Sequence, residues 1–374
     1  MKKGRIIIGF ISLVLLGTFI LLVNHVKQEK QFKHQQQAQS TPVVKPKALP
    51  VKSPALATIN KDQTLDNLIA KSGFTGTALI VKNNQIILRK GYGNANQAKK
   101  SLNTPDTLYP IASTEKALIA TCILQLDQQH RLSVNDPIDK YLANFPDGNQ
   151  LKLRNFLTHT SNIVGRAEDS QTKSLNQMIK EIESNGVRGP IGHWRYEDSN
   201  YTVLVKVLEQ VTHESYKKYL TQHVFKPAGI KTVGYVNQNF SSLKNASIGY
   251  LKQNNQLTAV ALPNFSQLYG VSDMYMNVTS MYQFDRALMN KKFFNAAHLQ
   301  EMFTPGSSSH YGMGFYNDSG LIVNRGYVSG WVISNGFTHD GKDYILLFSN
   351  VKDKQLSLGK LNDEILHELT QIKN

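Results

Sequence analysis

The sequence predicts an α+β fold, on the evidence of two hairpin patterns and the helical patterns between them. Strand-like runs at 76–81 and 85–88 flank Lys82-Asn83-Asn84, and runs at 331–333 and 344–348 flank Asp340-Gly341. Short polar turns between apolar runs are typical of β-hairpins. Because the two hairpins lie at opposite ends of the predicted domain, we expect one sheet that joins distant segments of the chain, with helices inserted between them.

Apolar residues at helical spacing predict the helices between and after the hairpins. Cys122 falls inside the first of these helices, where we expect a buried and inert thiol. The predicted inserted helices span residues 117–126, 153–157, 201–211 and 281–288. The closing helix carries Leu361, Ile365, Leu366, Leu369 and Ile372.

Composition excludes several classes of protein. The chain has 374 residues, with 42 lysines and arginines against 27 aspartates and glutamates, and a single cysteine. One cysteine excludes a disulfide scaffold and a cysteine-rich zinc module. The pair His213-Glu214 lacks the second histidine of a zinc-protease helix, so we expect no metal and no other cofactor. The net charge of +15 indicates an anionic partner, which is nucleic acid, a membrane surface or a cell-wall polyanion.

The amino-terminal segment predicts where the protein acts. Residues 6–23 carry no charge and follow Lys2, Lys3 and Arg5. A helix of this length spans about 27 Å, close to the hydrocarbon core of a bilayer, and it exceeds the apolar part of a cleaved signal peptide. We therefore expect residues 1–5 to form a cytoplasmic tail and residues 6–23 to form an uncleaved transmembrane signal anchor.

A stalk is predicted after the anchor. Residues 24–58 are rich in glutamine, proline and lysine, and such a segment cannot bury enough apolar surface to offset the loss of conformational entropy. We expect it to be disordered and to carry the globular domain, residues 59–374, on the outer side of the cell membrane. The basic charge is then expected to face the membrane or the wall rather than nucleic acid.

Ser113 and Lys116 are the leading candidates for a nucleophile and its base. Both lie at the start of a predicted helix, where residues three apart share a face. A serine hydroxyl needs a neighbour that takes its proton, and a lysine can do so when desolvation and the positive helix end lower its pKa. The backbone N–H of Ser113 is then available for a developing oxyanion. Spacing alone is weak evidence, because five other serine–lysine pairs in this chain share it.

Two downstream motifs strengthen the case. Tyr196-Glu197-Asp198 precedes a predicted helix, and Asn324-Arg325-Gly326-Tyr327 opens the carboxyl-terminal hairpin. With the Ser-x-x-Lys pair ahead of them, the chain resembles the serine β-lactamase and penicillin-binding-protein superfamily, in its class C-like branch, over residues 59–374. It looks most like membrane-anchored penicillin-binding-protein-like proteins of Gram-positive bacteria and like teichoic-acid D-alanyl esterases. Further recurrent family features are Leu157-Thr158-His159-Thr160-Ser161, Lys226-Pro227-Ala228-Gly229 and Tyr311-Gly312-Met313-Gly314-Phe315.

The resemblance implies a β-lactamase/transpeptidase-like fold, with an antiparallel sheet flanked by terminal helices and an inserted helical subdomain. It also implies roles for the motif residues. Ser113 would be the acylated nucleophile, Lys116 its proton acceptor, and Tyr196 a proton shuttle to the leaving group. Gly326 would lie on the strand that edges the site, and Tyr327 would supply the second oxyanion N–H. For His159 we expect a structural hydrogen-bonding role near the site.

Two positions depart from the family pattern. Asp198 stands where the family has an asparagine, and an ionised carboxylate cannot donate a hydrogen bond to the substrate. The Asp198 carboxylate favours the protonated form of Lys116, so Tyr196 would take over more of the role of general base. The same carboxylate can pair with a cationic group of a substrate. Asn324 stands where a lysine or histidine helps to bind a free carboxylate of the substrate. Because successive side chains of a strand point to opposite faces, we expect Arg325 to point away from the cleft.

At the predicted site, Asn324 thus replaces the cation that binds a substrate carboxylate, and Asp198 adds a carboxylate that can bind a substrate ammonium group. A D-alanyl ester on teichoic acid matches this site, with a free ammonium, no free carboxylate and a polyphosphate leaving chain. We predict a serine hydrolase of the cell envelope that acts through an acyl-enzyme on a D-alanyl group, as a teichoic acid D-alanyl esterase. Two alternatives stay open: a DD-carboxypeptidase acting on peptidoglycan stem peptides, and a catalytically idle protein that binds wall polymer or β-lactams.

Overall fold

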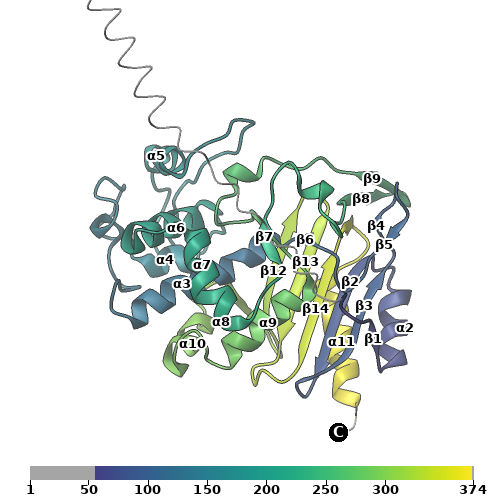
Figure 1. Ribbon diagram of the computed structural model, residues 1–374. Helices are drawn as coiled ribbons and strands as arrows, with labels where there is room; N and C mark the ends of the chain where they lie inside the picture. Colours follow the sequence, from purple (N-terminus) through teal and green to yellow (C-terminus); the bar gives the residue numbers. More distant parts are fainter. Residues whose placement is uncertain (1–54, 373–374) are drawn as a thin grey trace, which may run out of the picture. The chain divides into compact units, whose positions relative to one another are not determined.

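A seven-stranded antiparallel sheet forms the centre of the computed structural model, which describes residues 55–372 (Figure 1). The strands lie in the order β1-β3-β2-β14-β13-β12-β11. Their bounds are Ile59–Asn60 (β1), Gly76–Lys82 (β2), Gln85–Tyr92 (β3), Tyr316–Asn317 (β11), Ile322–Val328 (β12), Trp331–Phe337 (β13) and Tyr344–Ser349 (β14).

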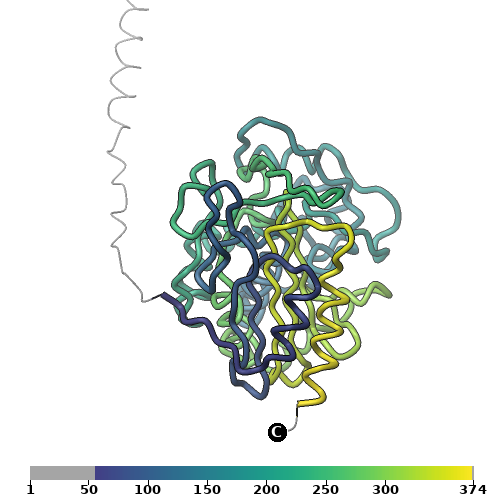
Figure 2. The backbone as a smooth tube through the Cα atoms, turned by 90° about the vertical axis from the view of Figure 1, so that its right-hand side faces the viewer, coloured from purple at the N-terminus to yellow at the C-terminus, as the bar shows by residue number. Residues whose placement is uncertain are grey.

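The sheet joins the two ends of the domain, as the sequence predicts. Strand β2 pairs antiparallel with β14, from Gly76 opposite Ser349 to Val81 opposite Tyr344. Figure 2 shows the early part of the described chain beside its last part. Both predicted hairpins, β2–β3 and β13–β14, are confirmed. The α+β prediction is therefore correct.

Helices cover both faces of the sheet (Figure 1). On one face α2 and α11 pack against β-strands through one cluster of buried apolar side chains, and on the other face a larger cluster joins the sheet to α3, α9 and the inserted helices. The predicted helices correspond to α3, α4, α6, α9 and α11, while α2, α5, α7, α8 and α10 were not predicted. The bounds are Gln63–Lys71 (α2), Glu115–Gln128 (α3), Leu153–Leu157 (α4), Leu175–Asn185 (α5), Ser199–Thr212 (α6), Tyr216–Leu220 (α7), Lys226–Ala228 (α8), Val278–Met289 (α9), Ala296–Phe303 (α10) and Leu358–Gln371 (α11).

Three small sheets, β6-β10-β7, β15-β8-β9 and β4-β5, accompany the central sheet in the described part of the chain. In the first, β10 lies between β6 and β7, and the N–H of Ile111 donates to the carbonyl of Met274, 3.0 Å away. This contact holds the chain just before the predicted nucleophile. In the second, β15 runs parallel to β8 directly after the sheet strand β14. Their strands are Asn94–Asn96 (β4), Ser101–Leu102 (β5), Tyr109–Pro110 (β6), Val233–Tyr235 (β7), Tyr250–Gln253 (β8), Gln256–Ala259 (β9), Met274–Met276 (β10) and Val351–Asp353 (β15).

Several predictions concern residues outside the described part of the chain. The cytoplasmic tail at 1–5, the signal anchor at 6–23 and most of the stalk at 24–58 fall there. Among residues 55–372, no helix has the length and apolarity that crossing a membrane requires. The anchor therefore stays a prediction.

Candidate active site

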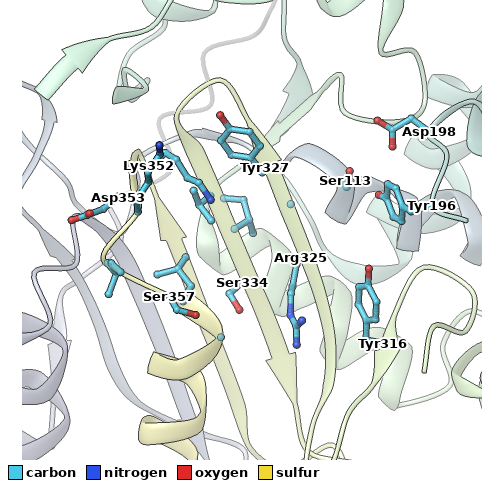
Figure 3. A pocket seen from close by; sticks show the side chains of 17 residues that line it. Ser113, Tyr196, Asp198, Tyr316, Arg325, Tyr327, Ser334, Lys352, Asp353 and Ser357 are labelled. Carbon is cyan, nitrogen blue, oxygen red and sulfur yellow. The ribbon is translucent and has the colours of Figure 1, made fainter. Parts of the chain in front are cut away.

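The predicted nucleophile lies at a sharp turn between a strand and a helix. Strand β6 ends at Pro110, a short 3₁₀ turn covers Ala112–Thr114, and α3 follows directly. Ala112 has a φ of 51°, in the left-handed region that non-glycine residues rarely adopt. Ser113 thereby stands at the amino-terminal end of the helical segment beside the cleft, as Figure 3 shows. Its N–H belongs to the first turn, which has no helical acceptor.

Lys116 contacts the serine from a fully buried position. Its ammonium donates to Ser113 Oγ at 3.0 Å and to the carbonyl of Val271 at 3.4 Å, and it lies 2.7 Å from Asp198 Oδ1. Burial by itself lowers the pKa of Lys116, but the Asp198 carboxylate, and then Tyr196, outweigh burial and hold this pKa above its usual range. Lys116 is therefore an ammonium at neutral pH in this arrangement.

Tyr196 joins the pair from a distant part of the chain. Its phenol interacts with the side chains of both Ser113 and Lys116, and the lysine Nζ lies 5.3 Å from the centre of the tyrosine ring. Burial raises the pKa of Tyr196, although the nearby ammonium opposes this effect. The structure thus brings hydroxyl, amine and phenol together, as the sequence motifs require.

His159 supports Tyr196 from behind. The two rings stack with their centres 4.2 Å apart. Nδ1 of His159 accepts hydrogen bonds from the N–H of Glu197 at 3.2 Å and from the side-chain amide of Asn200 at 3.1 Å, which puts the imidazole proton on Nε2. Burial, with the charge of Lys116, holds the pKa of His159 well below its usual range. A neutral, structural histidine agrees with the role expected for this residue.

Asp198 lies at the rim of the cleft, immediately before α6. Its side chain is 45% exposed, whereas that of its partner Lys116 is completely buried. The Asp198 carboxylate thus contacts the buried lysine on one side and is accessible from the cleft on the other. A carboxylate placed in this way is accessible to a cationic group in the cleft.

The orientation of β12 corrects one prediction. Arg325 was expected to point away from the cleft, but it lines the cleft, while Asn324 is buried on the opposite face. The amide of Asn324 donates to the carbonyl of Thr114 at 3.3 Å and its oxygen accepts from Asn335 at 3.0 Å. Asn324 therefore ties β12 to the nucleophile turn, and it does not line the cleft. Arg325 forms an ion pair with Asp318 and lies over the ring of Tyr316.

Gly326 explains why β12 has this orientation. A Cβ at this position would lie 2.7 Å from the carbonyl oxygen of Ile111 and 3.1 Å from the N of Ser113. Only glycine permits so close an approach of strand and nucleophile turn. Since side chains alternate along a strand, Asn324 shares the buried face with Gly326, and Arg325 and Tyr327 share the open face.

The cleft extends well beyond the serine. It encloses about 740 Å³ and reaches from Ser113 across β12 and β13 to β15 and the start of α11 (Figure 3). Its lining residues are Ser113, Tyr196, Asp198, Tyr316, Arg325, Gly326, Tyr327, Val332, Ile333, Ser334, Lys352, Asp353, Lys354, Leu356, Ser357, Leu358 and Gly359.

Comparison with known proteins identifies the family. A family model described as "Beta-lactamase" matches residues 62–358. The chain belongs to the β-lactamase family. It is 36% identical to "Putative penicillin-binding protein PbpX" of Bacillus subtilis strain 168, over 99% of this chain and 95% of that protein. It is 28% identical to "Teichoic acid D-alanine hydrolase" of Staphylococcus aureus, over 82% of this chain and 78% of that protein.

A solved structure agrees with this assignment. The crystal structure of FmtA from Staphylococcus aureus superposes with a TM-score of 0.77 at 25% identity, covering 85% of this chain and 92% of that one. The predicted β-lactamase-like fold is therefore confirmed. With Ser113, Lys116 and Tyr196 assembled in its cleft, this β-lactamase family member is a penicillin-binding-protein-like serine hydrolase.

Proposed function

We propose that the protein removes D-alanyl esters from teichoic acid. The observation that carries the proposal is the contact of 2.7 Å between the buried Lys116 and the half-exposed Asp198. A carboxylate at this point attracts the free ammonium that an esterified D-alanine presents. The relatives named teichoic acid D-alanine hydrolase support the same substrate.

The pairing of Asp198 also suggests how the substrate activates the enzyme. While Asp198 faces Lys116, the lysine keeps its proton and cannot accept another from Ser113. A substrate ammonium competes for the same carboxylate. When Asp198 turns to the substrate, burial is left as the main influence on Lys116, and burial lowers its pKa. Lys116 then releases its proton to water in the cleft, and the neutral amine is a base 3.0 Å from the serine hydroxyl.

The chemistry proceeds through an acyl-enzyme. Ser113 Oγ attacks the ester carbonyl carbon, and its proton passes to Lys116 and through Tyr196 to the polyol oxygen as the bond from carbon to that oxygen breaks. The N–H groups of Ser113 and Tyr327 stabilise the negative charge on the carbonyl oxygen. Water then attacks the D-alanyl-serine ester by the reverse route, which releases D-alanine and restores the serine.

Arg325 favours a second candidate, a DD-carboxypeptidase. Its guanidinium lines the cleft, where it is in place to bind the terminal carboxylate of a D-Ala-D-Ala peptide. The ion pair with Asp318 already compensates this charge, however. Asn324, at the position that carries a cation in the family, is buried and occupied by Thr114 and Asn335. We therefore rank the peptidase below the esterase.

We also propose that the protein is a single-pass membrane protein with its catalytic domain outside the cell. This proposal rests on the uncharged segment at 6–23 and its basic flank. Protease added to intact cells should digest the domain if it is outside. Protection of the domain in intact cells, with digestion after lysis, would contradict this topology.

The substrate is tested by offering the full-length protein two compounds. We expect release of D-alanine from D-alanylated teichoic acid, with Ser113→Ala as the inactive control. Release from a D-Ala-D-Ala peptide alone would establish the peptidase instead. Labelling by a fluorescent penicillin or a fluorophosphonate that depends on Ser113 would separate either enzyme from an idle binder.

A further inference from the structure

The far end of the cleft carries a second set of groups that the acylation chemistry does not use. It is formed where β15 leads into α11, on the other side of β12 and β13 from the serine. Figure 3 shows Ser113, Tyr196 and Asp198 on one side of Tyr327, and Lys352 on the other. A substrate acylated at Ser113 therefore has room to continue across the exposed face of these two strands.

Positive charge collects at this end. Lys352 is half-buried and its Nζ lies 4.9 Å from the centre of the Tyr327 ring, while Lys354 is exposed. Within residues 55–372, neither lysine has a carboxylate at ion-pair distance. The acidic residue between them, Asp353, is already paired with Lys252 at 2.8 Å. No carboxylate in the described part of the chain therefore neutralises these two ammonium groups.

The other charges of the cleft are compensated or negative. Arg325 is paired with Asp318, and Lys116 is paired with Asp198. The cleft is thus bipolar, with an accessible carboxylate near the serine and, at the far end, two ammonium groups that no carboxylate within residues 55–372 pairs with. The start of α11 faces the same end through Leu358 and Gly359, and a helix amino terminus adds partial positive charge.

Apolar surface lies between the two ends. The ring of Tyr327 is 53% exposed, and Val332 and Leu356 line the cleft nearby. A chain that alternates short aliphatic polyol units with phosphates matches this lining, because its carbons pack on the ring and its phosphates meet the lysines. A short stem peptide that ends in a carboxylate near Ser113 has no such repeating charge.

We propose that Lys352 and Lys354, with Tyr327, form a subsite that binds phosphodiester groups of the polyol-phosphate chain whose D-alanyl ester occupies Ser113. This proposal rests on the proposed esterase function and adds to it the part of the enzyme that recognises the leaving chain. It makes the protein selective for polymer over free D-alanyl esters. Phosphate recognition by ammonium groups also makes that selectivity decrease as salt increases.

The test compares two substrates and two matched variants of the full-length protein. The substrates are D-alanylated poly(glycerol phosphate) and D-alanine methyl ester, which has no phosphate. For Lys352→Gln/Lys354→Gln we expect the ratio of kcat/KM on the polymer to kcat/KM on the methyl ester to fall about 5- to 10-fold, as two partly exposed ion pairs warrant. The control Lys291→Gln/Lys292→Gln removes the same charge from two exposed lysines outside the cleft, and its ratio should stay within about twofold of the wild type.

A binding measurement separates this inference from the proposed function. The protein with Ser113→Ala is titrated with poly(glycerol phosphate) that carries no D-alanine, at low and at high salt. We expect binding that weakens with salt and that the Lys352→Gln/Lys354→Gln changes reduce. If neither ester is hydrolysed by the wild type, the esterase fails, and this titration still decides the subsite. An unchanged ratio, or equal binding with and without the two lysines, would overturn the inference.

Discussion

Replacing Asp198 by asparagine tests directly whether this carboxylate binds the ammonium group of the substrate. The change keeps the shape of the side chain and removes its charge. Two unit charges about 4 Å apart attract by about 1 kcal/mol in water and about 4 kcal/mol at the effective dielectric near a protein surface. A carboxylate that is 45% exposed lies between these limits, at about 2 kcal/mol. We therefore expect roughly a 30-fold loss of preference for a charged substrate.

The assay measures kcat/KM for a D-alanyl ester and for its N-acetylated form, which has no ammonium. The ratio of the two values should fall roughly 30-fold in Asp198→Asn. On the N-acetylated ester the acid limb of the pH profile should move to lower pH, because Lys116 loses the carboxylate that holds its pKa high. The two readouts are independent, since one concerns the substrate and the other the lysine.

Asp340→Asn is the matched control. Asp340 is 55% exposed and faces Lys342 at 3.4 Å in the β13–β14 turn, and it does not line the cleft. Its substitution should leave both the ratio and the pH profile as in the wild type. If Asp198→Asn also leaves both unchanged, the carboxylate neither binds the substrate ammonium nor controls the protonation of Lys116, and both proposed roles of Asp198 are refuted.

Three further predictions follow from the site and the core. Gly326→Ala should lower kcat about 100-fold or more in steady-state kinetics, because its Cβ would push β12 from the Ser113 turn and spoil the oxyanion donors; near-normal kcat would show that the close approach is dispensable. Tyr196→Phe should lower kcat about 10²- to 10⁴-fold while the Lys116–Ser113 contact persists, and a loss below tenfold would remove the phenol from the proton path. Burial raises the pKa of Asp285 from 3.8 to about 8, so its protonation stabilises the fold fully below pH 3.8, and this contribution is lost as the pH rises toward 8. In urea unfolding, the free energy of unfolding of the wild type should fall between pH 5 and 8, and in Asp285→Asn this fall should be smaller by a few kcal/mol. An equally large fall in the variant would refute this.

Local patterns explain the elements that the sequence predicted correctly. The turn of the β2–β3 hairpin contains Asn83 and Asn84, both with positive φ, and asparagine tolerates that conformation. A helix such as α9 appears in the sequence because its buried residues recur at helical spacing. By contrast, α5 went unpredicted, although Ser174 and Gln177 form a capping box at its start.

The direction of the β12 side chains was not predictable from β12 alone. A strand with no clear apolar alternation has two possible orientations, and only its neighbours choose between them. Here the contact of Gly326 with the Ser113 turn makes the choice, and it buries Asn324 and exposes Arg325. The prediction placed Asn324 in the cleft and Arg325 on the opposite face, and the structure shows the reverse because β12 presents its other face to the cleft.

By itself, the sequence determined the family, the α+β architecture and the three motifs, because hairpins, helical spacing and short motifs are local properties of the chain. The tertiary structure alone decided which groups surround them. The carbonyl of Val271 at Lys116, the stacked ring of His159, and Lys352 in the cleft come from segments far apart in the chain. Charge, burial and orientation depend on these through-space neighbours, and a linear sequence does not state them.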